Sequence, residues 1–154
     1  MERRSLLLGA LALVATHAEA GLAIAGSSPS PVGVWTTIDD DGKTPKAVVQ
    51  IEQRGSKLFG KIIELIRPDR PNPKCDECDG DLKGKPIQGM QILWDLEEDG
   101  DEWSGGKILD PNNGKVYRCY VEVVEGGAQL KVRGYIGISL LGRTQYWRKG
   151  RPGG

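Results

Sequence analysis

The chain has 154 residues, with 21 basic and 21 acidic side chains and a formal net charge of zero at pH 7. This length suits one domain, and the neutral balance gives no electrostatic signature of a protein that binds nucleic acid or an anionic membrane.

The N-terminal residues 1–25 have the composition of a secretory signal peptide with a short leader. A basic start is followed by the apolar run Ser5–Ala15, and small residues allow cleavage after Ala20 or Ala25. The apolar run is too short to span a bilayer, so we expect no transmembrane segment. Arg3 and Arg4 also resemble a twin-arginine export signal. We therefore expect an exported protein in the periplasm or outside the cell, in a Gram-negative envelope.

Export would remove His17, the single histidine of the chain. Cleavage would also remove equal numbers of acidic and basic residues, so the mature chain stays neutral. A chain without histidine has no serine–histidine or cysteine–histidine machinery and no imidazole acid or base near neutral pH. We expect a protein that is not an enzyme, with no catalytic residues and no cofactor.

After a flexible linker at residues 26–31, residues 32–150 predict a single all-β domain. Short stretches rich in β-branched and aromatic residues alternate with turn signals. The predicted strands are Gly33–Ile38, Lys46–Gln53, Lys57–Ile66, Ile87–Trp94, Glu102–Leu109, Lys115–Val124, Gln129–Tyr135 and Arg143–Arg148. About eight antiparallel strands usually close into a barrel that holds side chains or one small ligand. A β-sandwich is the alternative.

Large aromatic residues at the two ends of the domain favour closure of the barrel. Trp35 opens the first strand and Trp147 ends the last, where Arg143 and Arg148 are basic neighbours. A chain whose first and last strands each carry a large aromatic residue and basic neighbours is a candidate for a sheet that closes on itself.

The acidic clusters favour turns and solvated surface over metal sites. Asp39-Asp40-Asp41-Gly42 suits a turn, because short polar side chains bond their own backbone, and the further ligands of a calcium loop are missing. Glu97–Asp101 predicts a second acidic turn. No metal site is expected.

The segment Arg67–Pro86 predicts a long loop with Cys75-Asp76-Glu77-Cys78 as its staple. In an oxidising compartment this pair favours a structural disulfide between Cys75 and Cys78. A metal site and a redox dithiol are the alternatives, opposed by the shortage of ligands and by acidic neighbours that raise thiol pKa values. Cys119, in the middle of a strand, predicts a buried free thiol.

The link between the last two predicted strands is apolar, with Ile136, Ile138, Leu140 and Leu141 between glycines. Exposed at one end of a barrel, it would gate a ligand or meet a membrane or a partner. Because the flanking glycines let it fold inward, we favour a barrel plug.

Several motifs together resemble one family. They are Gly33-x-Trp35, Pro73-x-Cys75-x-x-Cys78, Lys83-Gly84-Lys85-Pro86-Ile87-x-Gly89, GKILDPNNGKVY from Gly106 to Tyr117 and VRGYIGISLLGRTQYW from Val132 to Trp147. The chain is similar to DUF2147, a family of small secreted bacterial proteins of uncharacterised function. The resemblance implies export and a lipocalin-like (calycin-like) barrel. It also implies that the ring of Trp35 packs under Arg143 or Arg148, in a cation–π contact that closes the barrel floor.

The function expected is binding of a small apolar or amphipathic ligand inside the barrel. The residues expected to contact or gate the ligand are Tyr117, Arg133, Tyr135, Ile136, Ile138, Leu140 and Leu141. The alternative is an envelope structural or interaction protein with a filled barrel and a protein partner. A thiol or metal protein is a third hypothesis.

Overall fold

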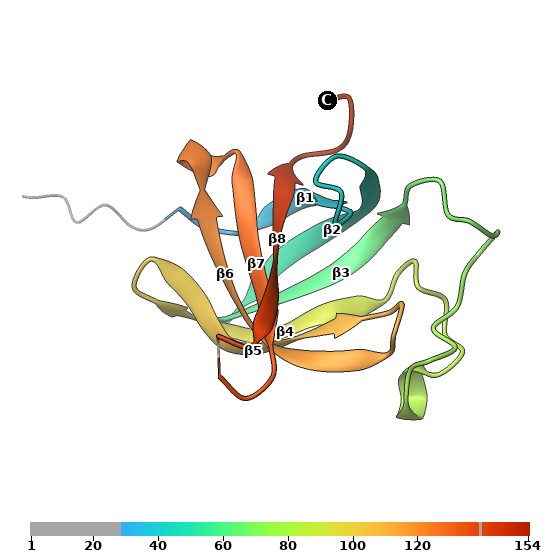
Figure 1. Ribbon diagram of the computed structural model, residues 1–154. Coiled ribbons are helices and arrows are strands. Elements are labelled where there is room, and N and C mark those ends of the chain that lie inside the picture. Colours follow the sequence, from blue (N-terminus) through green and yellow to red (C-terminus); the bar gives the residue numbers. More distant parts are fainter. Residues whose placement is uncertain (1–28, 139) are drawn as a thin grey trace, which may run out of the picture.

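The computed structural model describes residues 29–138 and 140–154, and their strands form a closed antiparallel barrel (Figure 1). Neighbours along the chain are neighbours in the sheet, and β1 also pairs with β8. The predicted all-β meander closing into a barrel is therefore confirmed. The predicted signal peptide and its cleavage sites lie outside the described residues.

The described part of the chain contains eight strands and two short 3-10 helices. The strands are β1 Gly33–Ile38, β2 Pro45–Arg54, β3 Lys57–Leu65, β4 Gln91–Asp99, β5 Glu102–Asp110, β6 Lys115–Val124, β7 Gln129–Tyr135 and β8 Gly142–Lys149. The 3-10 helices are η1 Gly80–Leu82 and η2 Glu125–Gly127.

Strand β4 differs from its predicted range, Ile87–Trp94. Ile87 belongs to the preceding loop, where its N–H donates to the carbonyl of Pro73 at 3.0 Å. At the other end the strand continues to Asp99. A positive φ of 57° at Asp95 breaks the simple alternation, so that Leu93 and Leu96 are both fully buried. The alternation of inward and outward residues in the sequence is interrupted at Asp95, whereas the hydrogen bonds of β4 to its neighbouring strands continue beyond it.

One end of the barrel is closed by Trp35, which is buried and donates its indole N–H to the carbonyl of Pro31 at 2.8 Å. The cation over its ring is Lys149, with Nζ 4.5 Å from the ring centroid. Gly33 makes room for this ammonium group, because a Cβ there would lie 3.1 Å from Nζ. Gly33 also has a φ of 139°, a backbone conformation that residues with a side chain rarely adopt.

The expectation that Arg143 or Arg148 covers Trp35 is thus corrected to Lys149. Arg143 lies at the opposite end of β8 and forms an ion pair with Asp40. Arg148 donates to the carbonyl of Gly42 at 3.3 Å. Alternation explains the difference, because Trp147 points inward and Lys149, two residues on, shares its face, whereas Arg148 points outward.

The seam between β1 and β8 is short, with two registered pairs, Trp35 with Lys149 and Thr36 with Arg148. The buried hydroxyl of Thr36 donates to the carbonyl of Gly150 at 2.6 Å, and the N–H of Gly150 donates to Val34 at 2.8 Å. These bonds extend the seam beyond the end of β8 and complete the barrel wall.

Candidate functional site: a cavity in the open half of the barrel

The end of the barrel that Trp35 closes is filled by side chains. Its fully buried members include Trp35, Ile51, Leu58, Leu96, Val121 and Leu130. None of these lines the cavity described below, which lies towards the other end of the strands. The barrel is therefore packed at one end and hollow at the other.

The cavity has a volume of about 900 Å³. Most of its depth is lined by buried apolar side chains, namely Ile38, Ala47, Ile62, Ile87, Ile92, Leu109, Val132 and Trp147. Small residues on the inner wall leave this space open: Ala47 on β2 has a single methyl group, and Gly134 on β7 has no side chain. Binding sites for small molecules usually have volumes of roughly 300–1,000 Å³ and mostly apolar walls.

Polar groups in the cavity are few. The indole N–H of Trp147 donates to Oε1 of Gln145 at 3.2 Å, and both residues line the wall. The hydroxyl of Tyr117 accepts a hydrogen bond from Nδ2 of Asn113 at 3.0 Å, which leaves the hydroxyl proton for another acceptor. Such isolated groups in an apolar wall orient a ligand more than they hold it.

The mouth of the cavity carries charges of both signs. Lys46 lies 3.8 Å from Asp39, Arg70 donates to Asp76 at 2.8 Å, and Arg143 pairs with Asp40. Other charged residues at the mouth are Arg67, Asp69, Lys74, Glu77 and Asp110. The rim is polar without a dominant sign of charge.

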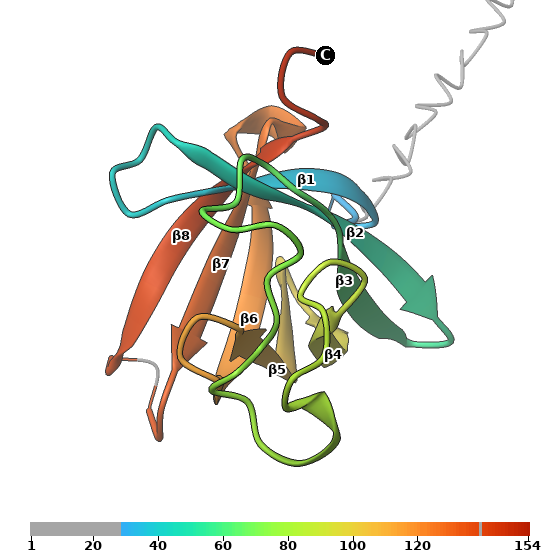
Figure 2. The same ribbon diagram turned by 90° about the vertical axis from the view of Figure 1, so that its right-hand side faces the viewer.

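Four connections surround this mouth: those between β1 and β2, β3 and β4, β5 and β6, and β7 and β8. The longest joins β3 to β4 and crosses in front of the barrel in Figure 2. It is ordered by its own hydrogen bonds, including Cys75 N–H to Lys85 at 2.9 Å and Gly84 N–H to Cys75 at 2.9 Å. The sequence was therefore right in predicting a stapled loop.

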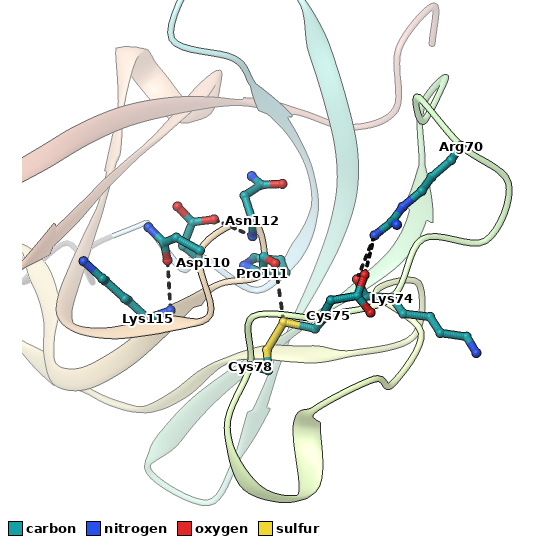
Figure 3. Close-up of a disulfide and its surroundings, with 10 residues drawn as sticks. Arg70, Lys74, Cys75, Cys78, Asp110, Pro111, Asn112 and Lys115 are labelled. Carbon is teal, nitrogen blue, oxygen red and sulfur yellow. Dashed lines mark hydrogen bonds and ion pairs between the residues drawn. A yellow bond between two sulfur atoms is a disulfide. The ribbon is translucent and has the colours of Figure 1, made fainter.

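The staple is a disulfide between Cys75 and Cys78, both buried (Figure 3). The Sγ of Cys75 lies 3.4 Å from the carbonyl oxygen of Pro111 in the turn between β5 and β6. At Gly114 in the same turn, a Cβ would lie 1.8 Å from the carbonyl oxygen of Glu77. The disulfide loop thus rests directly on a glycine backbone, which holds it beside the mouth.

The structure brings some of the predicted ligand residues to the cavity and leaves others outside. Tyr117, Ile136 and Leu141 line it, and Tyr135 borders it at the rim, with its ring beside Arg118 on the outer side of the sheet. Arg133 does not, because it points to the outer face of β7 and donates to Oγ1 of Thr144 at 2.8 Å. Ile138 and Leu140 also lie outside the lining.

The apolar link is not a plug. The exposed fractions of Ile136, Ile138, Leu140 and Leu141 are 63%, 59%, 83% and 67%. The link closes a turn in which the N–H of Ile136 donates to Leu141 at 3.1 Å. This bond carries the chain directly from β7 into β8, so the link stays at the rim. The alternative interpretation, an exposed apolar segment at one end of the barrel, describes the structure.

Cys119 is a buried free thiol, as predicted, and its burial raises its pKa from 9.0 to about 12.

The acidic segment after β1 forms a turn, as predicted. Oδ1 of Asp41 accepts hydrogen bonds from the N–H groups of Lys43 and Thr44, each at 2.8 Å. Across residues 29–138 and 140–154, no three His, Cys, Asp or Glu side chains are grouped to hold a metal ion.

Most of the apolar lining was missed by the sequence analysis. Residues such as Ala47 and Val132 were recognisable as inward-facing from the alternation of their strands. Which inward residues border a cavity depends on which half of the barrel is filled, and no local pattern carries that signal.

Comparison with known proteins places this geometry in context. The model of a family described as uncharacterized protein conserved in bacteria (DUF2147) matches residues 33–149. A solved structure from the human pathogen Helicobacter pylori, described as belonging to the lipocalin family, is similar with a TM-score of 0.67 and 18% identity. The similarity covers 79% of this chain and 83% of that one. No curated protein matches the chain. Within the described residues, no helix is long and apolar enough to cross a membrane.

Proposed function

Since the chain belongs to the DUF2147 family and folds as a lipocalin-like barrel, we propose that it is an exported, non-enzymatic protein that binds a small apolar or amphipathic ligand in its cavity. The observation that carries the proposal is the cavity of about 900 Å³ with buried apolar walls. A barrel completely filled by its side chains would have favoured the interaction protein instead.

The distribution of polarity favours an amphipathic ligand. The apolar part would bury surface against Ile62, Val132 and Trp147, where each Å² removed from water contributes about 25 cal/mol. The polar part would lie at the mouth, among charges of both signs. Because the rim has no dominant charge, a neutral or zwitterionic head group fits it better than a strongly charged one.

The test is native mass spectrometry of the protein purified from the envelope, repeated after denaturation. We expect extra mass that disappears on unfolding, and its value identifies the ligand. A native mass equal to that of the chain with one disulfide, together with no uptake of added amphiphiles, would contradict the proposal.

A matched pair of variants locates the ligand. Gly134→Leu introduces a side chain into the cavity, and its Cβ meets Ile108 only at 3.4 Å, an ordinary contact. We expect this variant to fold and to lose the bound mass. Val32→Leu adds apolar volume at a half-exposed position outside the cavity and should keep it. Equal occupancy in both variants would place the ligand elsewhere.

The exposed link favours a second candidate, an envelope interaction protein that acts through its surface. A thiol or metal function has less support, because Cys75 and Cys78 are joined in a buried disulfide and Cys119 is buried. Ligand occupancy and surface interaction are compatible.

A further inference from the structure

The outer face of β5, β6 and β7 gathers basic and aromatic side chains that are scattered in the sequence. Cys119 and Val121 are buried inside the barrel, so the residues between and beside them on β6 point outward. By register, Lys107 pairs with Arg118 and Arg118 with Tyr135. We call the following set the basic outer face: Lys107, Arg118, Tyr120, Lys131, Arg133 and Tyr135.

Contacts confirm that these side chains lie together. The guanidinium of Arg118 is 5.9 Å from the ring centroid of Tyr135, and Nζ of Lys131 is 5.5 Å from that of Tyr120. The two tyrosine rings are 6.4 Å apart. Cations and aromatic rings therefore form one continuous surface.

The basic outer face carries a net positive charge. Glu122, on the same side of β6, pairs with Lys131 at 3.2 Å. Among the residues that the structure describes, neither Arg118 nor Lys107 has a carboxylate within ion-pair distance. Neutrality of the whole chain thus conceals a local excess of positive charge.

The exposed link borders this face directly. Tyr135, the last residue of β7, pairs with Arg118 and with Gly142, and Ile136 follows it in the chain. In Figure 1 the link is the turn that projects beyond the lower ends of β7 and β8. An apolar tip is therefore continuous with a basic, tyrosine-rich flank.

We propose that the protein docks on an anionic lipid bilayer, with the aliphatic side chains of the link inserted between lipids and the basic outer face against the phosphates. Aliphatic side chains enter the boundary between head groups and acyl chains, tyrosines favour that boundary, and basic residues are attracted by anionic lipids. The apolar tip and the adjacent basic flank follow the same order as the acyl chains and the phosphates of an anionic bilayer.

A lipid surface fits better than a protein or a soluble polyanion. A stable protein interface takes about 800 Å² from each partner, which four aliphatic side chains on one narrow turn do not supply. A polyanion would use the basic face but would leave the apolar tip in water. Ile136 and Leu141 belong to both the tip and the cavity lining, so a docked molecule has its cavity mouth near the lipids.

The experiment is flotation of the purified exported protein with vesicles of phosphatidylcholine and phosphatidylglycerol, and with vesicles of phosphatidylcholine alone. We expect binding to the anionic vesicles that weakens with salt. Leu140→Asp should weaken it about tenfold or more, because a charge replaces the most exposed inserted side chain. Arg118→Gln should weaken it about fivefold, the effect of one basic residue near an anionic surface.

The control variants introduce an acid or remove a cation at positions outside the link and the basic outer face. Val32→Asp introduces an acid at an exposed apolar position near the closed end, and Lys83→Gln removes an exposed cation from the loop before β4. Both should float like the wild type. Gly134→Leu should float like the wild type as well, so loss of ligand and loss of docking are separate results.

Two results would overturn the proposal. One is failure of the wild type to float with the anionic vesicles. The other is retention on immobilised heparin that Arg118→Gln abolishes, with vesicle binding unchanged by Leu140→Asp, which would assign the face to a soluble polyanion. The substituted residues other than Gly134 have exposed side chains. Circular dichroism should therefore show that every variant is folded.

Discussion

At the scale of single residues, the chemistry of this protein depends on burial. Cys119 has no partner cysteine and is surrounded by the apolar barrel interior, so its thiolate is strongly disfavoured. Gly33 shows the opposite case, in which the absence of a side chain matters: it admits the ammonium of Lys149 over Trp35.

Burial of Cys119 predicts inertness towards thiol reagents. The thiolate is the reactive form and the pKa of Cys119 is raised to about 12, so the native protein at pH 8 should react negligibly. The unfolded protein should show one reactive thiol per chain. A colorimetric thiol assay with and without denaturant measures both values. Rapid reaction of the folded protein at pH 8 would show that the barrel wall opens near β6.

The sign of the pH dependence follows from the same pKa. The unfolded thiol loses its proton near 9.0 and the folded one near 12, so alkali favours the unfolded state. The contribution of the protonated Cys119 thiol to the free energy of unfolding is complete below pH 9 and is lost as the pH rises towards 12. Cys119→Ala should flatten this part of the wild-type curve of unfolding free energy against pH.

At the scale of elements, the loop between β3 and β4 behaves as a second layer on the barrel rather than as a free connection. Its disulfide is buried against Pro111 and its backbone lies on Gly114. The sequence motif Cys-x-x-Cys predicted the staple, and the gap between the predicted strands Glu102–Leu109 and Lys115–Val124 predicted a connection at Pro111. Their contact joins segments 36 residues apart, which neither feature could predict alone.

This contact predicts a large effect of Gly114→Ala. The new Cβ would overlap the carbonyl of Glu77, so the loop must shift, and we expect a loss of roughly 2–4 kcal/mol in unfolding free energy. Gly80→Ala is the matched control, because Gly80 also has a positive φ of 57° but nothing within 4 Å of its Cβ position. It should lose about 1 kcal/mol.

Urea unfolding measures both glycine variants, and hydrogen exchange at residues 75–78 reports release of the loop. Equal losses in the two variants would mean that strain at positive φ, rather than the contact with Glu77, explains the cost.

At the scale of the whole molecule, closure depends on a short seam and charge is segregated around the barrel. Two registered pairs join β1 to β8, and Thr36 reinforces them. The basic outer face lies on β5 to β7, whereas the tip of the β4–β5 hairpin is acidic, with Glu97, Glu98, Asp99 and Glu102.

The seam predicts that Thr36→Val destabilises the barrel without altering the cavity. The valine is close in shape but leaves the half-buried carbonyl of Gly150 without its hydroxyl donor, at a cost of about 1–3 kcal/mol. Thr36→Ser keeps the donor and should cost less. Urea denaturation gives the order, and ligand uptake should be unchanged in both. An undiminished stability of Thr36→Val would show that the seam is held by the backbone alone.

Local patterns in the sequence were sufficient for the strands, for most turns and for the stapled loop, because each depends on residues close in the chain. At β4, the late start reflects the hydrogen bond of Ile87 within the preceding loop, and the extension to Asp99 follows a bulge at Asp95. The wrong cation was assigned to Trp35 because the face on which a basic residue lies depends on its position in the strand. The family resemblance correctly implied a lipocalin-like barrel.

The sequence by itself therefore determined the strand order, the capacity to close and the composition of the apolar link, since alternation and turn chemistry are properties of short segments. Only the tertiary structure decided that half of the barrel is hollow, that the link remains at the rim and that the positive charges share one face. Each of these depends on which residues the folded strands bring side by side. Such residues are distant in the chain, and the overall composition does not show how they are arranged.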